Sequence, residues 1–325
     1  LPLPEGWKLQ RPGAQRLPEP PFSVNEVKVA VLQLAIKDLV ATFGSAYPEG
    51  PRYLQRLDEL AAKIEQVPDE ASGESQALTA ALVALRREAL SANPLLNFDK
   101  LLLVKRGAGS PRLGLPQNWE SNSSLPQTGY DDQIAVLSPV GPDGQITTLL
   151  KPADGQFVGD VDLHFSAERL LFSMPGANGR WQVHELPLGG RDSAAAAAEP
   201  RELTLIREPD VDNYDACYLP DGRILFTSTA PFIGVPCVYG GSHVTNLYLA
   251  DQAGAIRQLT VDQEHNWCPT VLNNGRVLYL RWEYTDLPHA HSRRLFHMNP
   301  DGTGQMEYLS SNSYFPNSFF YARPV

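Results

Sequence analysis

The sequence of 325 residues predicts a mainly β protein: a β-propeller, forming an incomplete ring of about four blades, preceded by a small α-helical region. Three observations predict this fold. A strand–turn–strand motif (the phrase below) occurs three times. Its copies end at Phe172, Phe226 and Tyr279, which are 54 and 53 positions apart. A second pair of short strands follows each copy. Amphipathic helical stripes precede the first copy.

Each copy of the phrase indicates a β-hairpin, since Asp221-Gly222 and Asn274-Gly275 are turn pairs between apolar runs. Four strands repeated about every fifty residues are typical of propeller blades of the WD40 or TolB kind, which bury their faces by stacking. The phrase predicts second strands of successive blades at 170–173, 224–227 and 277–280. Outer strands are predicted near 201–204, 257–260 and 305–309.

The predicted number of blades leaves two alternatives for how the ring is closed. At about fifty residues each, residues 95–325 supply about four blades and the beginning of another, because Pro316 stands 47 positions after Pro269. Propellers close at about four to eight blades. Either a final strand closes a four-bladed ring, or the blades continue beyond residue 325; we favour the second.

The residues before the blades predict an arm and a helical region. Residues 1–21 are Pro-rich and polar, which indicates an extended arm. Residues 22–94 are predicted to hold three helices, the first opening on a capping box at 23–26. Its apolar stripe is Val27, Val31, Leu34, Leu39 and Phe43. We expect a small bundle that buries Leu34, Leu57, Leu60, Leu82 and Leu85.

The β region begins with an incomplete sheet. Strands are predicted at 101–104, 134–137 and 146–150, the last two flanking the turn at 142–144. The long loop at 107–132 is of a length that is often functional. An alanine run at 193–198 reads as a surface insertion.

Composition excludes several partners. A net charge of −10 and an isoelectric point near 5.2 argue against nucleic acid or an anionic membrane as the main partner. No apolar run approaches the ~20 residues of a membrane span. The cysteines Cys217, Cys237 and Cys268 form neither a disulfide framework nor a zinc ribbon. Three buried free thiols, or one bridge and a spare thiol, are both possible; the apolar surroundings favour the first.

The polar residues before and within each inner strand are the candidate binding residues, because inner strands line a propeller's channel. They are Asp160, Asp162, Asp212, Tyr214, Asp215, His265, Asn266 and Trp267. Such residues also commonly join adjacent blades by capping backbone N–H groups, and that alternative stays open. Asp210, Asp212 and Asp215 offer oxygens for Ca²⁺ but lack the Gly and terminal Glu of an EF-hand loop.

His265 and Cys268 are the candidate metal ligands. An imidazole and a thiolate suit Zn²⁺ or a haem iron, and His243, or His289 with His291, could complete the site. Residues three apart in a regular strand point to opposite faces, so this pair requires a turn or bulge.

Five runs of the sequence carry a family resemblance; they lie at 159–165, 212–222, 265–275, 281–286 and 295–304. In these runs the chain resembles the hydrazine synthase alpha-subunit-like proteins of planctomycete-type bacteria. The resemblance covers roughly residues 95–325 and implies a periplasmic or exported propeller, with c-type haem segments downstream in the hydrazine synthases themselves. This chain has no Cys-x-x-Cys-His, so we expect no cofactor in it, and any haem would be bound beyond Val325. It also has Ala-Pro-Phe at 230–232 where those relatives read Ala-Cys-Phe.

These observations support two main functions. The first is a binding or assembly platform whose partner is another protein or the remaining propeller and cytochrome domains. The alternative is a subunit of a haem-dependent oxidoreductase whose haem segments lie outside this chain. A third, weaker reading is a hydrolase that uses paired acids at the channel mouth, which would need a defined carboxylate separation. No catalytic motif is complete.

Overall fold

A computed structural model describes residues 28–67, 73–111, 122–141, 143–188, 199–203, 205–235, 239–283, 292–309 and 318–324. The chain divides into two compact units. The first contains the helices and residues 138–145, and the second contains 102–137 and 146–325. The predicted arm at 1–21 and the capping box at 23–26 lie outside the described residues.

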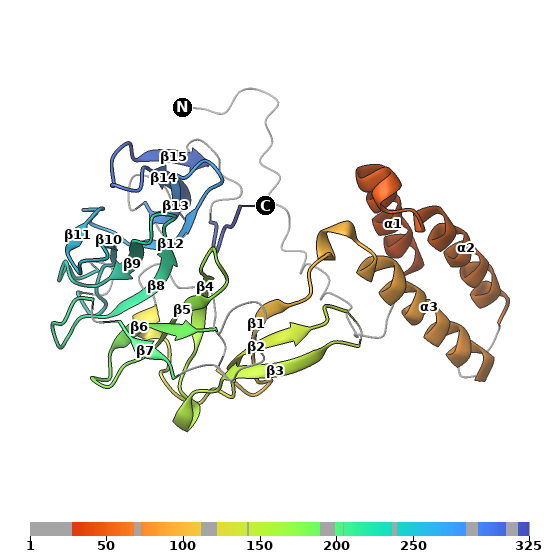
Figure 1. Ribbon diagram of the computed structural model, residues 1–325, viewed down its shortest axis with the longest axis horizontal. Coiled ribbons are helices and arrows are strands. Elements are labelled where there is room, and N and C mark those ends of the chain that lie inside the picture. Colours follow the sequence, from red (N-terminus) through yellow and green to blue (C-terminus); the bar gives the residue numbers. More distant parts are fainter. Residues whose placement is uncertain are drawn as a thin grey trace. The chain divides into compact units, whose positions relative to one another are not determined.

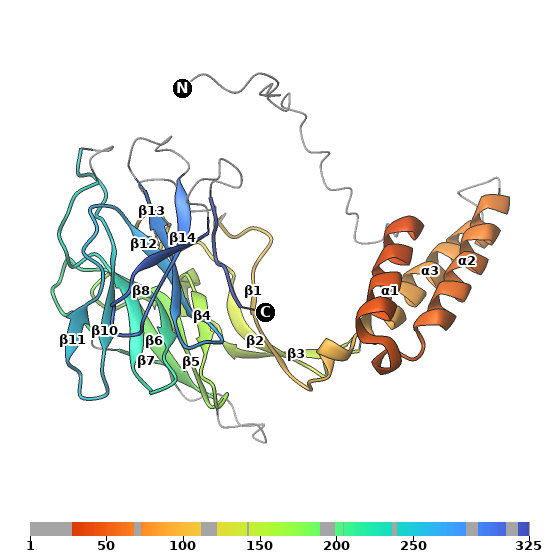
Figure 2. The ribbon, with the colours of Figure 1, turned by 90° about the horizontal axis from the view of Figure 1, so that it is seen from above.

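The first unit is built on three helices, α1 (Val29–Phe43), α2 (Gly50–Gln66) and α3 (Gly73–Ser91), which Figure 2 shows side by side. Short 3-10 turns follow α1 at Gly44–Ala46 and α3 at Pro94–Leu96. The Tyr47 hydroxyl donates to the Ala89 carbonyl (2.7 Å). The core residues are Leu32, Ile36, Leu39, Tyr47, Tyr53, Leu57, Leu82, Leu85 and Ala89.

The prediction for the first helix was wrong about its buried face. Leu34 is 67% exposed and Val31 61%, whereas Leu32 and Ile36 are buried. Apolar residues lie nearly all round α1, so helical periodicity allows two stripes, and packing against the other helices selects the stripe of Leu32, Ile36 and Leu39. Burial of Leu57, Leu82 and Leu85 is confirmed, and Leu60 is half-buried.

Helix α1 with its following turn, Val29–Ala46, is long and apolar enough to cross a membrane by length and composition alone. Core helices and signal sequences have the same composition, so a membrane span does not follow from this property.

The second unit is a β-propeller. A three-stranded sheet, β1 (Leu101–Lys105), β2 (Gln133–Ser138) and β3 (Gln145–Leu150), precedes three four-stranded sheets. We call these three sheets blades A, B and C. In chain order their strands are β4 (Gly159–Leu163), β5 (Arg169–Pro175), β6 (Trp181–Pro187) and β7 (Arg201–Glu202); β8 (Asn213–Tyr218), β9 (Ile224–Ser228), β10 (Asn246–Ala250) and β11 (Ile256–Gln258); β12 (Asn266–Val271), β13 (Val277–Trp282), β14 (Arg293–Met298) and β15 (Met306–Leu309).

Each blade is an antiparallel meander in which consecutive strands pair. Figure 1 shows β4, β8 and β12 next to one another, with β7, β11 and β15 on the outside. The three predicted second strands are confirmed as β5, β9 and β13. Their equivalence is visible in the register, where Phe172 pairs with His184, Phe226 with Tyr248 and Tyr279 with Phe296. The predicted outer strands are β7, β11 and β15.

Neighbouring blades bury a continuous apolar core between them. Leu225 and Leu247 of blade B pack with Val277 and Tyr279 of blade C, all fully buried. Burying one such side chain contributes about 1.5–3 kcal/mol relative to leaving it exposed, and a single blade has no other surface against which to do so. The stacking that the repeat predicts is therefore what stabilises each sheet.

A bulge recurs in every inner strand. The pairing register shifts after Gly159, Tyr214 and Trp267, and the next residue in each case, Asp160, Asp215 or Cys268, has a left-handed backbone with φ of 48° to 51°. Tyr321, 53 positions after Cys268, has the same backbone with φ 49°. Residues 318–324 therefore repeat the inner-strand geometry once more, beside Arg293 of blade C. Residues 310–317, with Pro316, lie outside the described part.

Candidate functional site

In blades B and C, the residue just before the inner strand joins two blades. The backbone N–H of Trp181, at the start of β6 in blade A, donates to Asp212 Oδ1 (3.0 Å) in blade B. Asp212 N–H in turn donates to Thr229 Oγ1 (2.9 Å). Asp212 is 5% exposed, so its carboxylate meets a buried backbone donor instead of solvent.

His265, 53 positions after Asp212, takes the same place between blades B and C. Its Nδ1 accepts the backbone N–H of Thr245 (3.1 Å), which stands directly before β10. Because Nδ1 is the acceptor, the proton of the neutral ring is on Nε2. The buried imidazole stacks on Trp267 (ring centroids 4.5 Å apart) and on Trp282 (5.8 Å).

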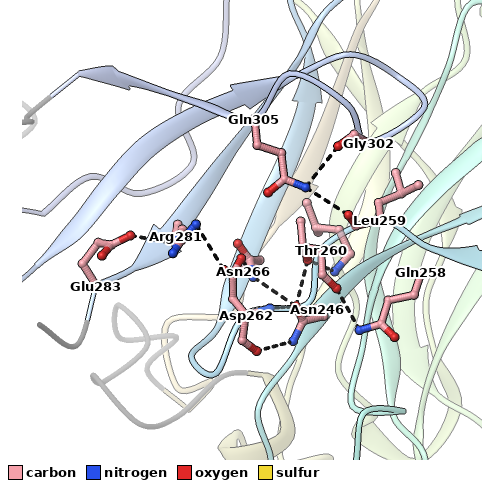
Figure 3. Close-up of polar contacts among 11 residues, drawn as sticks. Asn246, Gln258, Leu259, Thr260, Asp262, Asn266, Arg281, Glu283, Gly302 and Gln305 are labelled. Atoms are coloured by element: carbon pink, nitrogen blue, oxygen red, sulfur yellow. Dashed lines mark hydrogen bonds and ion pairs between the residues drawn. The ribbon is translucent and has the colours of Figure 1, made fainter.

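Asn266 enters a polar network between the same two blades (Figure 3). Its Nδ2 donates to Asp262 Oδ2 (3.0 Å) and to Asn246 Oδ1 (3.4 Å). Asn246 Oδ1 also accepts from Thr260 Oγ1 and from Asp262 N–H, both at 2.9 Å. The equivalent residue in blade B, Asn213, donates to Gln182 Oε1 of blade A (3.1 Å).

An acidic group continues this network outward. Arg281 contacts Asp262 Oδ1 (3.1 Å) and Glu283 Oε1 (2.6 Å), as Figure 3 shows. Burial, together with the charges of Glu283 and Asp262, raises the pKa of Glu264 to about 7, against a smaller opposing effect of Arg281. Two carboxylates thus contact one guanidinium, and Glu264 lies within its electrostatic influence.

The inner strands carry a second set of joints. Asp162 Oδ2 of blade A accepts the Tyr218 N–H of blade B (2.9 Å), and Asp215 Oδ2 of blade B accepts the Cys268 N–H of blade C (2.7 Å). Burial raises the pKa of Asp162 to about 6, although the Tyr218 N–H and Arg323 lower it. Burial and the Asp160 charge raise the pKa of Asp215 to about 7, against the lowering effects of Arg323 and Cys268.

The predicted aromatic candidates belong to the core. Tyr214 is 1% exposed and packs with Tyr130, Phe157 and Trp181. Trp267 is buried with Trp282 and Leu280. Asp160 is half-buried and acts on Asp215 through its charge. A binding role for these three residues stays a prediction.

The bulge that a metal pair would require is present, between Trp267 and Thr270. His265 Nδ1 nevertheless holds the Thr245 N–H, and burial raises the pKa of the Cys268 thiol well above its usual value. Within the described ranges no group of three or more His, Cys, Asp or Glu side chains is arranged to hold a metal ion. His289 and His291 lie outside those ranges, so a metal role for His265 and Cys268 stays a prediction.

The cysteines and the calcium candidates are separated in the structure. Cys217 and Cys268 are buried free thiols, and Cys237 lies outside the described residues. Asp210 is exposed, whereas Asp212 and Asp215 accept backbone N–H groups of different blades. Each of the three aspartates therefore lies in a different environment.

Sequence reasoning missed several residues of these joints, notably Asn213, Asn246, Thr260 and Arg281. Asn213 could have been found, because it stands 53 positions before Asn266 in the repeat. Asn246 and Thr260 lie in the third strand and after the fourth, and only the folded blade brings them beside the next inner strand.

No protein-family model matches the chain, and no curated protein matches it in sequence. Among solved structures it is similar to the hydrazine synthase of Kuenenia stuttgartiensis, at 12% identity and a TM-score of 0.48 over 64% of this chain and 31% of that one. It is also similar to TolB from Acinetobacter baumannii, at 14% identity and a TM-score of 0.31 over 73% of this chain and 59% of that one. A third similar structure is the tricorn protease, at 13% identity and a TM-score of 0.40 over 65% of this chain and 18% of that one. The chain therefore spans less than two thirds of each of these proteins. Likenesses at this level concern the propeller fold only.

Proposed function

We propose that this chain is a binding or assembly module: a propeller platform in a larger exported protein of the hydrazine synthase alpha-subunit kind. The observation that carries the proposal is how the structure uses the candidate acids and His265. Asp162, Asp212, Asp215 and His265 each accept a backbone N–H from an adjacent blade. A carboxylate or imidazole that holds a buried backbone donor is poorly placed to act as a general base.

The sequence resemblance supports the same function. The run 212–222 covers β8 and its turn, and the run 265–275 covers β12 and its turn. The sequence runs that carry the resemblance therefore lie on the inner strands and hairpins that build a blade. They support a common architecture and an exported location more directly than a common chemistry.

The alternative is a subunit of a haem-dependent oxidoreductase with its haem segments outside this chain. Covalent attachment of a c-type haem requires two cysteines three positions apart and a following histidine. Cys217 and Cys268 are 51 positions apart and both are buried, so these thiols do not fit the group. A covalently attached c-type haem would therefore have to be held by another segment or subunit.

The test is to produce the 325-residue chain in a bacterial periplasm together with the cytochrome c maturation machinery. We expect a purified protein with no Soret absorbance and no covalent mass increase. A co-expressed c-type cytochrome serves as the control for maturation. A stoichiometric haem spectrum on this chain would replace the binding module with the oxidoreductase.

A further inference from the structure

The connection between β9 and β10 is longer than its counterpart in blade A. Residues 176–180 suffice to join β5 to β6, whereas 229–245 join β9 to β10. The described part of this connection forms a two-stranded ribbon. Val244 N–H donates to the Ile233 carbonyl and Val235 N–H to the Ser242 carbonyl, both at 2.8 Å, and Gly234 bridges His243 between them.

The residues of this connection differ in burial. Val235 and Val244 are fully buried and pack with Trp267 and Trp282 of blade C, which anchors the ribbon. Elsewhere in the connection Phe232 is 53% exposed, and Tyr239 is fully exposed. A ribbon that is fixed by one face and displays aromatic side chains elsewhere has the form of a recognition element.

A second exposed residue group lies on the loop tied to the base of the ribbon. Asn246 Nδ2 donates to the Asp262 carbonyl (3.1 Å), and Thr245 N–H donates to His265 Nδ1. Val261, on that loop, is 83% exposed. We call the exposed apolar residues of the ribbon and the loop the arm patch: Phe232, Ile233, Tyr239 and Val261.

The charge beside the arm patch is negative. Asp262 directly follows Val261, and Glu264 lies two positions further on. Glu283 directly follows β13 and contacts Arg281 in Figure 3. Arg281 is the cation that contacts Asp262 and Glu283, so the acidic side chains of this group outnumber that cation.

We propose that the arm patch and the acidic group beside it bind a protein segment that places apolar side chains next to Lys or Arg. The inference rests on the proposed binding function and specifies its partner. Apolar side chains of the partner would cover the arm patch, and its cations would complement Asp262, Glu264 and Glu283. Nucleic acid and anionic lipid are disfavoured, because their phosphates would face these carboxylates. A second copy of the chain, whose net charge is −10, is disfavoured for the same reason.

The test begins with a random 12-residue peptide library displayed on phage and selected against the immobilised full chain. We expect selected peptides that combine Leu, Phe or Trp with Lys or Arg. Their dissociation constants, measured by fluorescence anisotropy, should rise at least about tenfold for the double variant Ile233→Ser with Tyr239→Ser. They should rise several-fold for Glu264→Gln with Glu283→Gln, and with added salt.

The matched control is Phe165→Ser. Phe165 is 61% exposed, on the turn between β4 and β5, and its removal should leave the binding unchanged. Gly234→Ala gives an independent variant that leaves every side chain of the arm patch intact. An added Cβ would lie 2.7 Å from Gly240 Cα, so Gly234 and Gly240 would have to move apart. It should also weaken binding. Near-ultraviolet circular dichroism of each variant checks that the propeller is folded.

Three outcomes would overturn the inference: no enrichment from the library, enrichment of acidic or uncharged peptides, or binding that Phe165→Ser abolishes and the ribbon variants do not. These failures are distinct from failure of the proposed function. A haem spectrum would contradict the binding module whatever the peptides do, whereas a failed selection would leave the module standing without this partner.

Discussion

Single side chains at the blade joints satisfy backbone groups that the sheets cannot. A buried N–H at the start of a third strand, or directly before it, is met by an acceptor from the next blade. Asp212 does so for Trp181 and His265 does so for Thr245. An acceptor of either chemical type serves, because the requirement is a lone pair at hydrogen-bond distance.

Removal of such an acceptor should destabilise the propeller. Asp212→Ala leaves the Trp181 N–H without its partner, and a buried unsatisfied donor costs about 1–3 kcal/mol. Asp212→Asn keeps an acceptor oxygen and should cost less. The measurement is urea unfolding followed by tryptophan fluorescence, with Asp210→Ala at an exposed neighbouring position as the control. Equal stability of the two Asp212 variants would show that the hydrogen bond contributes nothing.

The raised pKa of Asp215 predicts that folding stability depends on pH with the opposite sign to that expected for a salt-bridged acid. Its pKa is raised from 3.8 to about 7 by burial and by Asp160, with Arg323 and Cys268 opposing. The folded state therefore holds a proton that the unfolded state loses, so stability falls as pH rises from about 4 to about 7 and the penalty is complete above that.

Asp215→Asn should remove this penalty while keeping an oxygen for the Cys268 N–H. At pH 8 we expect the variant to be more stable than the natural chain by up to about 4 kcal/mol, since the pKa rises from 3.8 to about 7 and one pKa unit corresponds to about 1.36 kcal/mol. At pH 4 the two should be alike. Unfolding curves at both values test this, and a variant that is less stable at pH 8 would contradict it.

Elements of the propeller could be predicted because the same hairpin pattern is repeated along the chain. Phe172, Phe226 and Tyr279 mark second strands through their spacing, and the turn pairs at 221–222 and 274–275 mark the hairpins. The candidate site was predictable only in part. The acids and His265 were identified from their place before the inner strands. Their structural use depends on backbone groups of another blade, which no local pattern reports.

Helix α1 shows where periodicity is insufficient. Its residues are apolar nearly all round, and Leu34 and Ile36 are equally suited to a core by composition. Ile36 is fully buried and Leu34 is 67% exposed because the partner helices contact one stripe only. The choice is made by packing and not by the helix itself.

This asymmetry can be measured. Ile36→Ala should cost about 2–5 kcal/mol through lost burial and the cavity that remains. Leu34→Ala should change stability by less than about 0.5 kcal/mol, as is usual for an exposed position. Both are followed by helical ellipticity at 222 nm in urea. A large effect at Leu34 would indicate that this stripe is covered in solution.

At the scale of the whole molecule, the described helices and the described blades have separate hydrophobic cores. The helical core consists of residues from α1 to Ala89 of α3. The apolar clusters of the propeller consist of residues of the blades and the segments beside them. Units with separate cores can unfold separately, in which case no single free energy of unfolding describes the chain.

Two probes can distinguish these units, because their signals come from different parts of the chain. Trp181, Trp267 and Trp282 are buried in the propeller, whereas residues 28–101 contain no tryptophan. Tryptophan fluorescence should therefore follow the propeller, and ellipticity at 222 nm mainly the helices. We expect the two urea curves to have different midpoints, and Ile36→Ala to move the ellipticity curve alone. Coincident curves that Ile36→Ala shifts together would show that the two cores unfold as one cooperative unit, through contacts strong enough to couple them.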